Sequence, residues 1–365
     1  MRSPPATASV VDLLRAIVRI PSVSGEEVAC RDHLVAWLDA RGVDVRAVGR
    51  NAVAVIEGPE AGDASRGLLL CSHIDVVPVG PGWTRAPWDG ALEDGRVWGR
   101  GANDAKASVA AMAWTAAHVE SASLGAGRLV LALVCDEETG GEGLEVLGEE
   151  LGPFTASVVG EPTGLDVCRG QRGLLRTALV AEGKSAHASR PWEGENAIRK
   201  VARDLVALEG LDLGAEDPLL GPTTLEPTVI SGGTRPNVLP WRCTVEFDAR
   251  TTPACDNARL LERLQAVVKA RVVVRSNRFQ PVVTPEDAAI VRVALAASPT
   301  GRIGALGGVS DLFHVRHVPG VILGPGTSEA SHAPDEWVAV SQVEAAVTTY
   351  ARIVGDYLGG SIREI

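Results

Sequence analysis

The stretch from Leu68 to Lys106 constrains this chain more than any other. It begins as an apolar run typical of a buried strand, ends that run with His73 and Asp75, and presents Asp104 just before an Ala-rich segment. Side chains of a strand alternate between its two faces, so the histidine and the first aspartate are predicted to point the same way. A metal-binding histidine usually donates its other ring N–H to a carboxylate. The stretch therefore predicts one half of a metal site.

Composition excludes several classes of protein. The 365 residues allow about two domains of ordinary size. The net charge of -11 argues against binding to nucleic acid or to an anionic membrane surface, which needs clustered Lys and Arg. No run approaches the roughly 18 apolar residues of a membrane span, and charges interrupt the N-terminal apolar run, which indicates an amphipathic helix and not a signal peptide. The six scattered cysteines lack CxxC spacing, which favours buried, reduced thiols in a cytoplasmic protein.

Strands alternating with helices predict an α/β domain with a mostly parallel, buried sheet. The predicted strands are 43–48, 52–57, 67–72, 128–134, 156–160 and 318–324. The predicted helices are 10–20, 26–41, 105–120, one that continues to about residue 151, 285–297 and 340–358.

The pattern changes in the middle of the chain. There the predicted elements, strands 174–182 and 243–250 and helices 196–209 and 258–270, indicate a smaller α+β unit. We therefore expect 1–170 and 282–365 to form a discontinuous catalytic, metal-binding domain. The inserted domain is expected to cover 171–281.

Four clusters of acidic or imidazole groups follow the ends of apolar strands: SHID (72–75), CDEETG (135–140), VGEPTG (159–164) and GPGTSEASHAPDEW (324–337). In open α/β sheets, ligands bind at this edge. Gathered there, four carboxylates would repel one another unless a dication neutralised them: Asp104, Glu137, Glu138 and Glu161. Taken singly, each group has an ordinary explanation, such as a helix cap or a solvated loop. Together with two histidines they favour a dinuclear site of zinc, cobalt or manganese.

The ordered motifs HIDVVP, WGRGANDAK, DEE, GEPT and SHAPDE resemble the M20 family of co-catalytic metallohydrolases across nearly the whole chain. This family includes acetylornithine deacetylase, succinyl-diaminopimelate desuccinylase, glutamate-type carboxypeptidases and aminoacylases. The resemblance implies a zinc-exopeptidase type of catalytic domain with an inserted lid and dimerisation domain. The bridging motif, commonly ADMKG in the family, is NDAKA here and keeps Asp104 and Lys106.

The resemblance also implies a role for each site residue. One metal would be held by His73 and Glu161, the other by Glu138 and His332, with Asp104 as the bridge. Two further residues would act beside the metals. Asp75 would orient the first histidine, and Glu137 would be the general base that takes a proton from water and returns it to the leaving amine.

In the insert, the resemblance implies that His187 stabilises the oxyanion from the partner subunit of a homodimer. It places Asn237 and Arg250 at the substrate, with the arginine as a clamp for the α-carboxylate. A salt bridge between Arg250 and Asp248 is an equally weighted alternative. A Ser185–His187 nucleophilic pair is discounted because the GxSxG elbow is missing.

The substrate is an N-acyl amino acid by the same resemblance. The loop GPGTSEASHAPDEW resembles acetylornithine deacetylases, whereas GGVSD (307–311) resembles desuccinylases and the amino-group-carrier hydrolases of lysine biosynthesis. A peptidase of the same fold is a third possibility. We favour deacetylation of N-acetylornithine in arginine biosynthesis. A non-catalytic metal-binding relative is the alternative of another class, and the full set of ligands and base argues against it.

Overall fold

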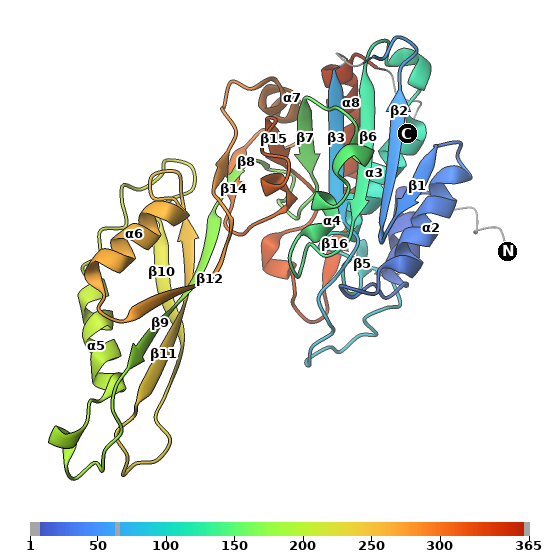
Figure 1. The fold of residues 1–365 in the computed structure, drawn as a ribbon. Helices are drawn as coiled ribbons and strands as arrows, with labels where there is room; N and C mark the ends of the chain where they lie inside the picture. The colour runs from blue at the N-terminus through green and yellow to red at the C-terminus, as the bar shows by residue number, and fades with distance from the viewer. Residues whose placement is uncertain (1–7, 63–65, 361–365) are drawn as a thin grey trace. The chain divides into compact units, whose positions relative to one another are not determined.

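Two compact units make up the chain (Figure 1). The computed structural model describes residues 8–62 and 66–360. One unit comprises Met1–Arg169, Thr284–Ala305 and Ser310–Ile365, and the other comprises Gly170–Val283 with Leu306–Val309. Most of the second unit is thus one long insertion in the sequence of the first, and Leu306–Val309 is a second, short one. Among the described residues, no helix is both long and apolar enough to span a bilayer.

The first unit is built on a central sheet in the order β1-β2-β6-β3-β7-β15-β8. Its middle is parallel, because β3 runs parallel to β6 and β7, and β15 runs parallel to β7. This confirms the predicted mostly parallel sheet. The bounds are β1 Val45–Val48, β2 Asn51–Glu57, β3 Gly67–His73, β6 Arg128–Val134, β7 Ala156–Val159, β8 Val167–Gln171 and β15 Gly320–Ile322.

Helices cover one face of this sheet, and alternation along β3 decides which side chains they cover. Leu68 and Leu70 belong to the large core cluster that includes the helical side chains, so they face the helices. His73 has the opposite parity and lies on the other face. The helices are α1 Val10–Val18, α2 Val28–Asp39, α3 Lys106–His118, α7 Ala289–Ala297 and α8 Val340–Leu358.

A small antiparallel sheet formed by β4 (Ala91–Glu93), β5 (Arg96–Trp98) and β16 (Trp337–Ala339) completes the first unit. It ties the loop before α3 to the segment that precedes α8, because β16 pairs with β5. All six cysteines of the chain are unpaired and buried, as the sequence predicts.

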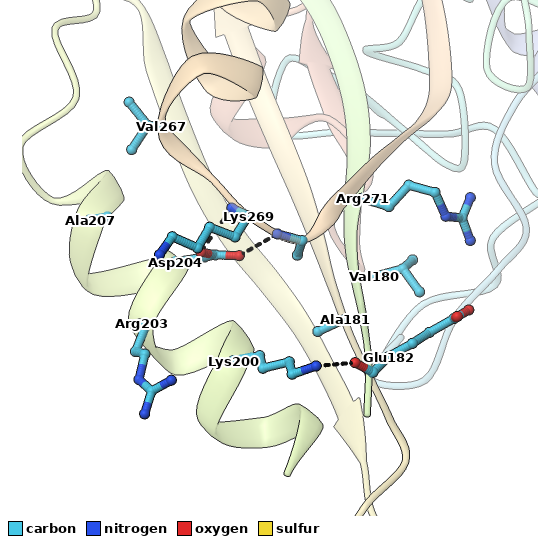
Figure 2. A pocket seen from close by; sticks show the side chains of 11 residues that line it. Val180, Ala181, Glu182, Lys200, Arg203, Asp204, Ala207, Val267, Lys269 and Arg271 are labelled. Carbon is cyan, nitrogen blue, oxygen red and sulfur yellow. Dashed lines mark hydrogen bonds between the residues drawn. The ribbon is translucent and has the colours of Figure 1, made fainter. Parts of the chain in front are cut away.

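The second unit has a four-stranded antiparallel sheet in the order β10-β11-β9-β12. Its bounds are β9 Gly173–Glu182, β10 Thr224–Gly232, β11 Arg242–Thr251 and β12 Arg271–Phe279, and its helices are α5 Ala197–Leu208 and α6 Asn257–Val267. A hollow of about 710 Å³ lies beside α5 (Figure 2). There Asp204 accepts hydrogen bonds from the backbone N–H groups of Lys269 and Ala270 at 3.0 and 2.7 Å. Asp204 thereby ties α5 to the start of β12.

Two sequence expectations differ from the structure. The helix expected to continue to about residue 151 is only the short α4 (Glu142–Glu145) followed by a 3-10 turn at Gly148–Leu151. The backbone at Gly143 lies so close to the end of β6 that an added Cβ would be 2.0 Å from the Cys135 carbonyl oxygen. That close approach packs α4 against the end of β6, where only glycine fits at position 143. Strands β10 and β12 were not anticipated, and Pro227 inside β10 explains why its pattern is weak.

Candidate metal centre

The predicted ligands come together at one edge of the central sheet. His73 ends β3, Glu138 follows β6, and Glu161 follows β7. Because these three strands are parallel neighbours, their carboxyl ends meet at the same edge. Asp104 arrives immediately before α3, and His332 arrives on the loop after β15.

Asp104 lies between the two histidines. Its Oδ1 is 3.3 Å from His73 Nε2, and its Oδ2 is 3.5 Å from His332 Nε2. His73 Nε2 also lies 3.8 Å from a carboxylate oxygen of Glu161, and His332 Nε2 lies 3.0 Å from one of Glu138. Each histidine therefore lies beside one glutamate of its own, and the two histidine–glutamate pairs share Asp104.

These side chains fit a bound cation. Ligand atoms of His73, Asp104 and Glu138 all lie within 4.8 Å of one another. Glu161 Oε1 is buried and has no hydrogen-bond partner among the described residues. Burying a carboxylate oxygen without a donor is costly, so an oxygen in this position is suited to a positive ion.

The pKa shifts of these side chains also indicate a site suited to a positive ion. Burial raises the pKa of Glu161 well above its usual value, and nearby Asp104 raises it further although His73 lowers it. Burial alone would lower the pKa of His73, but hydrogen bonds to Asp104 and Asp75 raise it well above the usual value. The His332 pKa is raised by its hydrogen bond with Glu138. Without a metal, these groups of the cluster thus bind protons more readily than usual, at the positions where cations would bind.

Asp75 lies just beyond the end of β3 and contacts both halves of the site. His73 Nδ1 lies 3.0 Å from the Asp75 backbone oxygen and 3.5 Å from its carboxylate Oδ1. The carboxylate accepts hydrogen bonds from the backbone N–H groups of Glu137 and Glu138, each at 3.2 Å, and from the Ser24 hydroxyl at 2.7 Å. Burial would raise the pKa of Asp75, but the hydrogen bonds from His73 and Ser24 lower it.

Glu137 sits beside the ligand cluster without joining it. Its backbone N–H is held by Asp75, and burial followed by the charge of Glu161 raises its pKa well above the usual value. A partly buried carboxyl group with a raised pKa, next to a candidate metal site, is suited to accept and return a proton.

Two buried acids beside the cluster have no role in the sequence prediction. Glu336 accepts hydrogen bonds from the backbone N–H groups of Gly101, Asn103 and Asp104 at 2.9–3.0 Å, and from Arg100 at 2.6 Å. It therefore fixes the loop that carries the shared aspartate, and its place in the SHAPDE motif was the available signal.

The second such acid is Asp311, at the end of the GGVSD segment. Its side chain approaches Cys71 on β3, with Sγ to Oδ2 at 4.0 Å, and its charge raises the pKa of Glu137. The signal for this residue was an acid within an otherwise apolar, buried stretch.

The predicted residues of the insert all lie in the second unit. Exposed His187 and Asn237 are on adjacent loops, since the Ala188 N–H donates to the Asn237 carbonyl oxygen at 2.9 Å. His187 Nδ1 accepts a hydrogen bond from the Ser189 backbone N–H at 3.2 Å, which leaves the ring proton of the neutral form on Nε2. Arg250 Nε donates to Asp248 Oδ1 at 2.7 Å, the salt bridge considered as an alternative.

Comparison with known proteins places this chain in a family. The model of peptidase family M20/M25/M40 matches residues 69–356. A succinyl-diaminopimelate desuccinylase from Cereibacter sphaeroides is 33% identical over 376 residues, which cover 95% of this chain and 98% of that protein.

Solved structures share the fold. An M20 family metallo-carboxypeptidase from Sulfolobus solfataricus superposes with a TM-score of 0.79 at 18% identity, covering 96% of this chain and all 100% of that one. A dinuclear metal-binding M20 peptidase from Bacillus subtilis superposes with a TM-score of 0.72 at 17% identity, covering 94% and 96%. The chain therefore belongs to peptidase family M20/M25/M40, as a metal-dependent hydrolase that acts on amide bonds.

Proposed function

We propose that this chain uses two divalent metal ions to hydrolyse the linear amide bond of an N-acyl amino acid. The observation that carries the proposal is Asp104, whose two carboxylate oxygens face different histidines at 3.3 and 3.5 Å. One carboxylate shared by two ligand sets is the arrangement of a two-metal hydrolase.

Each metal is assigned its own ligands. His73 and Glu161 would hold one ion, Glu138 and His332 would hold the other, and Asp104 would be shared by both. The donors are nitrogen and carboxylate oxygen, with no thiolate, so zinc is proposed and cobalt or manganese would also suit. When bound, such a pair polarises the amide carbonyl and lowers the pKa of water toward neutrality.

The proton transfers are assigned to Glu137. Its side chain is not needed for either metal, and Asp75 holds its backbone through a hydrogen bond at 3.2 Å. Glu137 takes a proton from the attacking water and later returns one to the leaving amine. Asp75 orients His73 and the loop of the base together.

His187 is proposed to stabilise the oxyanion from the partner subunit of a homodimer. The geometry of the second unit supports a role in trans. Arg242 and Arg250 lie near opposite ends of β11, separated by eight residues or about 26 Å of extended chain. His187 lies beyond the Arg242 end, since it bridges to Val238. One small substrate cannot contact both His187 and Arg250 of the same subunit.

The exposed edge of the second unit is proposed to mediate this dimer. Strand β10 is an edge strand, and its Val229 and Ile230 side chains are 59% and 61% exposed. An exposed apolar edge strand is a template for pairing with another chain. The unit would then serve as both lid and dimerisation domain, with Asn237 and Arg250 contacting the substrate.

For the substrate, the lead candidate is N-succinyl-diaminopimelate, because the Cereibacter sphaeroides relative is named as its desuccinylase. N-acetylornithine, favoured by the resemblance of the GPGTSEASHAPDEW loop, is the second candidate. Both reactions release a carboxylic acid and a free amine from the same type of amide.

The test is hydrolysis by metal-loaded protein. We would measure kcat/KM for N-succinyl-diaminopimelate, N-acetylornithine, N-acetylcitrulline and a set of dipeptides, with metal content determined on the same sample. Turnover of an N-acyl amino acid with two metals per chain supports the proposal. Preference for dipeptides would make the chain a peptidase, and a loaded protein inert toward the whole panel would favour a non-catalytic relative.

A further inference from the structure

The turn between β1 and β2 meets the loop that follows β6. Val48 pairs with Asn51, so Gly49 and Arg50 form a two-residue turn. From this turn, Arg50 donates to both carboxylate oxygens of Asp136, one of them at 3.0 Å, although 86 positions separate the two residues. Asp136 directly precedes the proposed base and has a positive φ of 60°.

The same guanidinium holds a second acid. Arg50 donates to the two carboxylate oxygens of Glu27 at 2.8 and 2.6 Å. The Glu27 side chain is 0% exposed, and its Oε1 also accepts from the Asp136 backbone N–H at 3.4 Å. Arg50 therefore lies between two neighbouring carboxylates, one of them fully buried, and its positive charge offsets their mutual repulsion.

Asn51, next to Arg50 in the hairpin, also forms hydrogen bonds with the loop that follows β6. Its Oδ1 accepts from the Cys135 backbone N–H at 2.9 Å, and its Nδ2 donates to the Gly143 carbonyl at 3.0 Å. Between these points the loop is a tight turn, since the Asp136 carbonyl accepts from the N–H groups of Gly140 and Gly141 at 3.0 and 2.6 Å. The hairpin thus contacts both ends of the turn that carries the proposed base and a proposed ligand.

A metal site is the competing explanation for these acids, because ligand atoms of Glu27, Cys135 and Asp136 lie within 4.8 Å of one another. The Arg50 guanidinium already forms a salt bridge with each of the two carboxylates, in the place where a cation would bind. Burial also raises the pKa of the Cys135 thiol to about 12, which keeps it protonated and a poor ligand. The geometry therefore favours a structural role for Arg50 over a second metal site.

We infer that Arg50 is a positioning residue. It holds the turn from Asp136 to Gly141 so that the Glu137 and Glu138 side chains are correctly placed at the proposed metal centre. The inference rests on the proposed roles of these two glutamates. Partners outside the ligand shell typically change activity or metal affinity by about 10–100-fold when removed. A misplacement of about 1 Å at a reacting group has an effect of similar size.

The test compares Arg50→Gln with Arg50→Lys and with a matched control, Arg46→Gln. Arg46 lies on the same hairpin and forms an exposed salt bridge with Glu150 at 2.7 Å, so its loss should change little. Hydrogen exchange of the 136–141 amides and the kcat and KM of the substrate would be measured on metal-loaded protein.

We expect Arg50→Gln to accelerate exchange in 136–141 and to lower kcat by about 10–100-fold, with KM nearly unchanged. Arg50→Lys keeps the positive charge but not the planar guanidinium. It should therefore show slower exchange and a higher kcat than Arg50→Gln, with both values short of those of the unmodified protein. Exchange in 136–141 equal to that of Arg46→Gln overturns the inference. Equal acceleration across β3 and β6 also overturns it, because the role would then be general stability.

The exchange measurement needs no substrate. If the unmodified protein hydrolyses nothing, the proposed function fails, and exchange in 136–141 still decides whether Arg50 positions the turn.

Discussion

Asp75 Oδ1 lies 3.2 Å from the backbone nitrogen of Glu137, so the residue that contacts His73 also holds the loop of the proposed base. The other carboxylate oxygen accepts from Glu138 and Ser24. One buried side chain thereby fixes the relative position of a proposed ligand from β3 and the proposed base from the loop after β6.

Replacing Asp75 with Asn should impair metal binding and turnover together. The amide offers one acceptor oxygen in place of two, so at least one N–H of the 137–138 backbone loses its partner. We expect losses of about 10–100-fold in metal affinity and in kcat/KM. Metal titration and steady-state kinetics would check both. Asp39→Asn, at an exposed position at the end of α2, is the control, and unchanged metal affinity in Asp75→Asn would contradict the expectation.

Replacing Glu137 with Gln should separate catalysis from metal binding. The amide keeps the size of the side chain but cannot accept the proton of water, so kcat should fall by about 10²–10⁴-fold. Metal content should remain that of the unmodified protein, because the proposed ligands are untouched. Elemental analysis and kinetics on one preparation would measure both, and near-normal turnover would remove Glu137 from the proposed role.

Three members of the cluster of proposed ligands could be predicted from the sequence because each follows an apolar run. His73, Glu138 and Glu161 come directly after strands, and the edge they share follows from parallel pairing alone. The parallel sheet itself follows from the alternation of strands and helices. Both the shared edge and the parallel sheet can be predicted from short segments of sequence considered separately.

The contacts that position this cluster could not be predicted in the same way. Arg50 meets Asp136 only because a hairpin turn packs against a distant loop, and nothing in the local pattern at 49–50 indicates it. Glu336 lies in a predicted motif, but its bonds to residues 101–104 depend on the pairing of β16 with β5. Long-range packing decides these partners, and periodicity carries no information about it.

Replacing Glu336 with Ala should destabilise the protein strongly. Its carboxylate is fully buried and pairs with Arg100, whose side chain is only 3% exposed. Removing one partner of a buried pair leaves an uncompensated charge and typically costs about 3–5 kcal/mol in the free energy of unfolding. Denaturant unfolding would measure it. Glu93→Ala, which breaks the exposed pair with Arg85, should cost no more than about 1 kcal/mol, and equal effects of the two changes would contradict the prediction.

Removing the metal should make stability depend on pH in a defined direction. In the metal-free fold the pKa values of Glu161 and His73 are raised, so the folded state binds more protons than the unfolded state. Stability is then lost as the pH rises above about 4.5, the ordinary value for Glu, toward the raised values.

Metal ligands must be deprotonated, so bound metal removes this dependence. The difference in melting temperature between loaded and metal-free protein should therefore grow from pH 5 to pH 8. Calorimetry on both forms would measure it, and a difference that shrinks with rising pH would show that these groups do not control the stability of the metal-free protein.

Mixing two inactive variants should restore activity if His187 acts across a dimer. In a hybrid of Glu137→Gln and His187→Ala chains, the site of the second chain keeps its own Glu137 and receives an intact His187 from its partner. Random exchange of subunits makes half of the dimers hybrid, with one competent site each, so the mixture should reach about one quarter of the unmodified activity. A role within one subunit predicts no recovery, because every site then lacks either its base or its histidine. Activity after co-refolding, compared with each variant refolded alone, decides between the two arrangements.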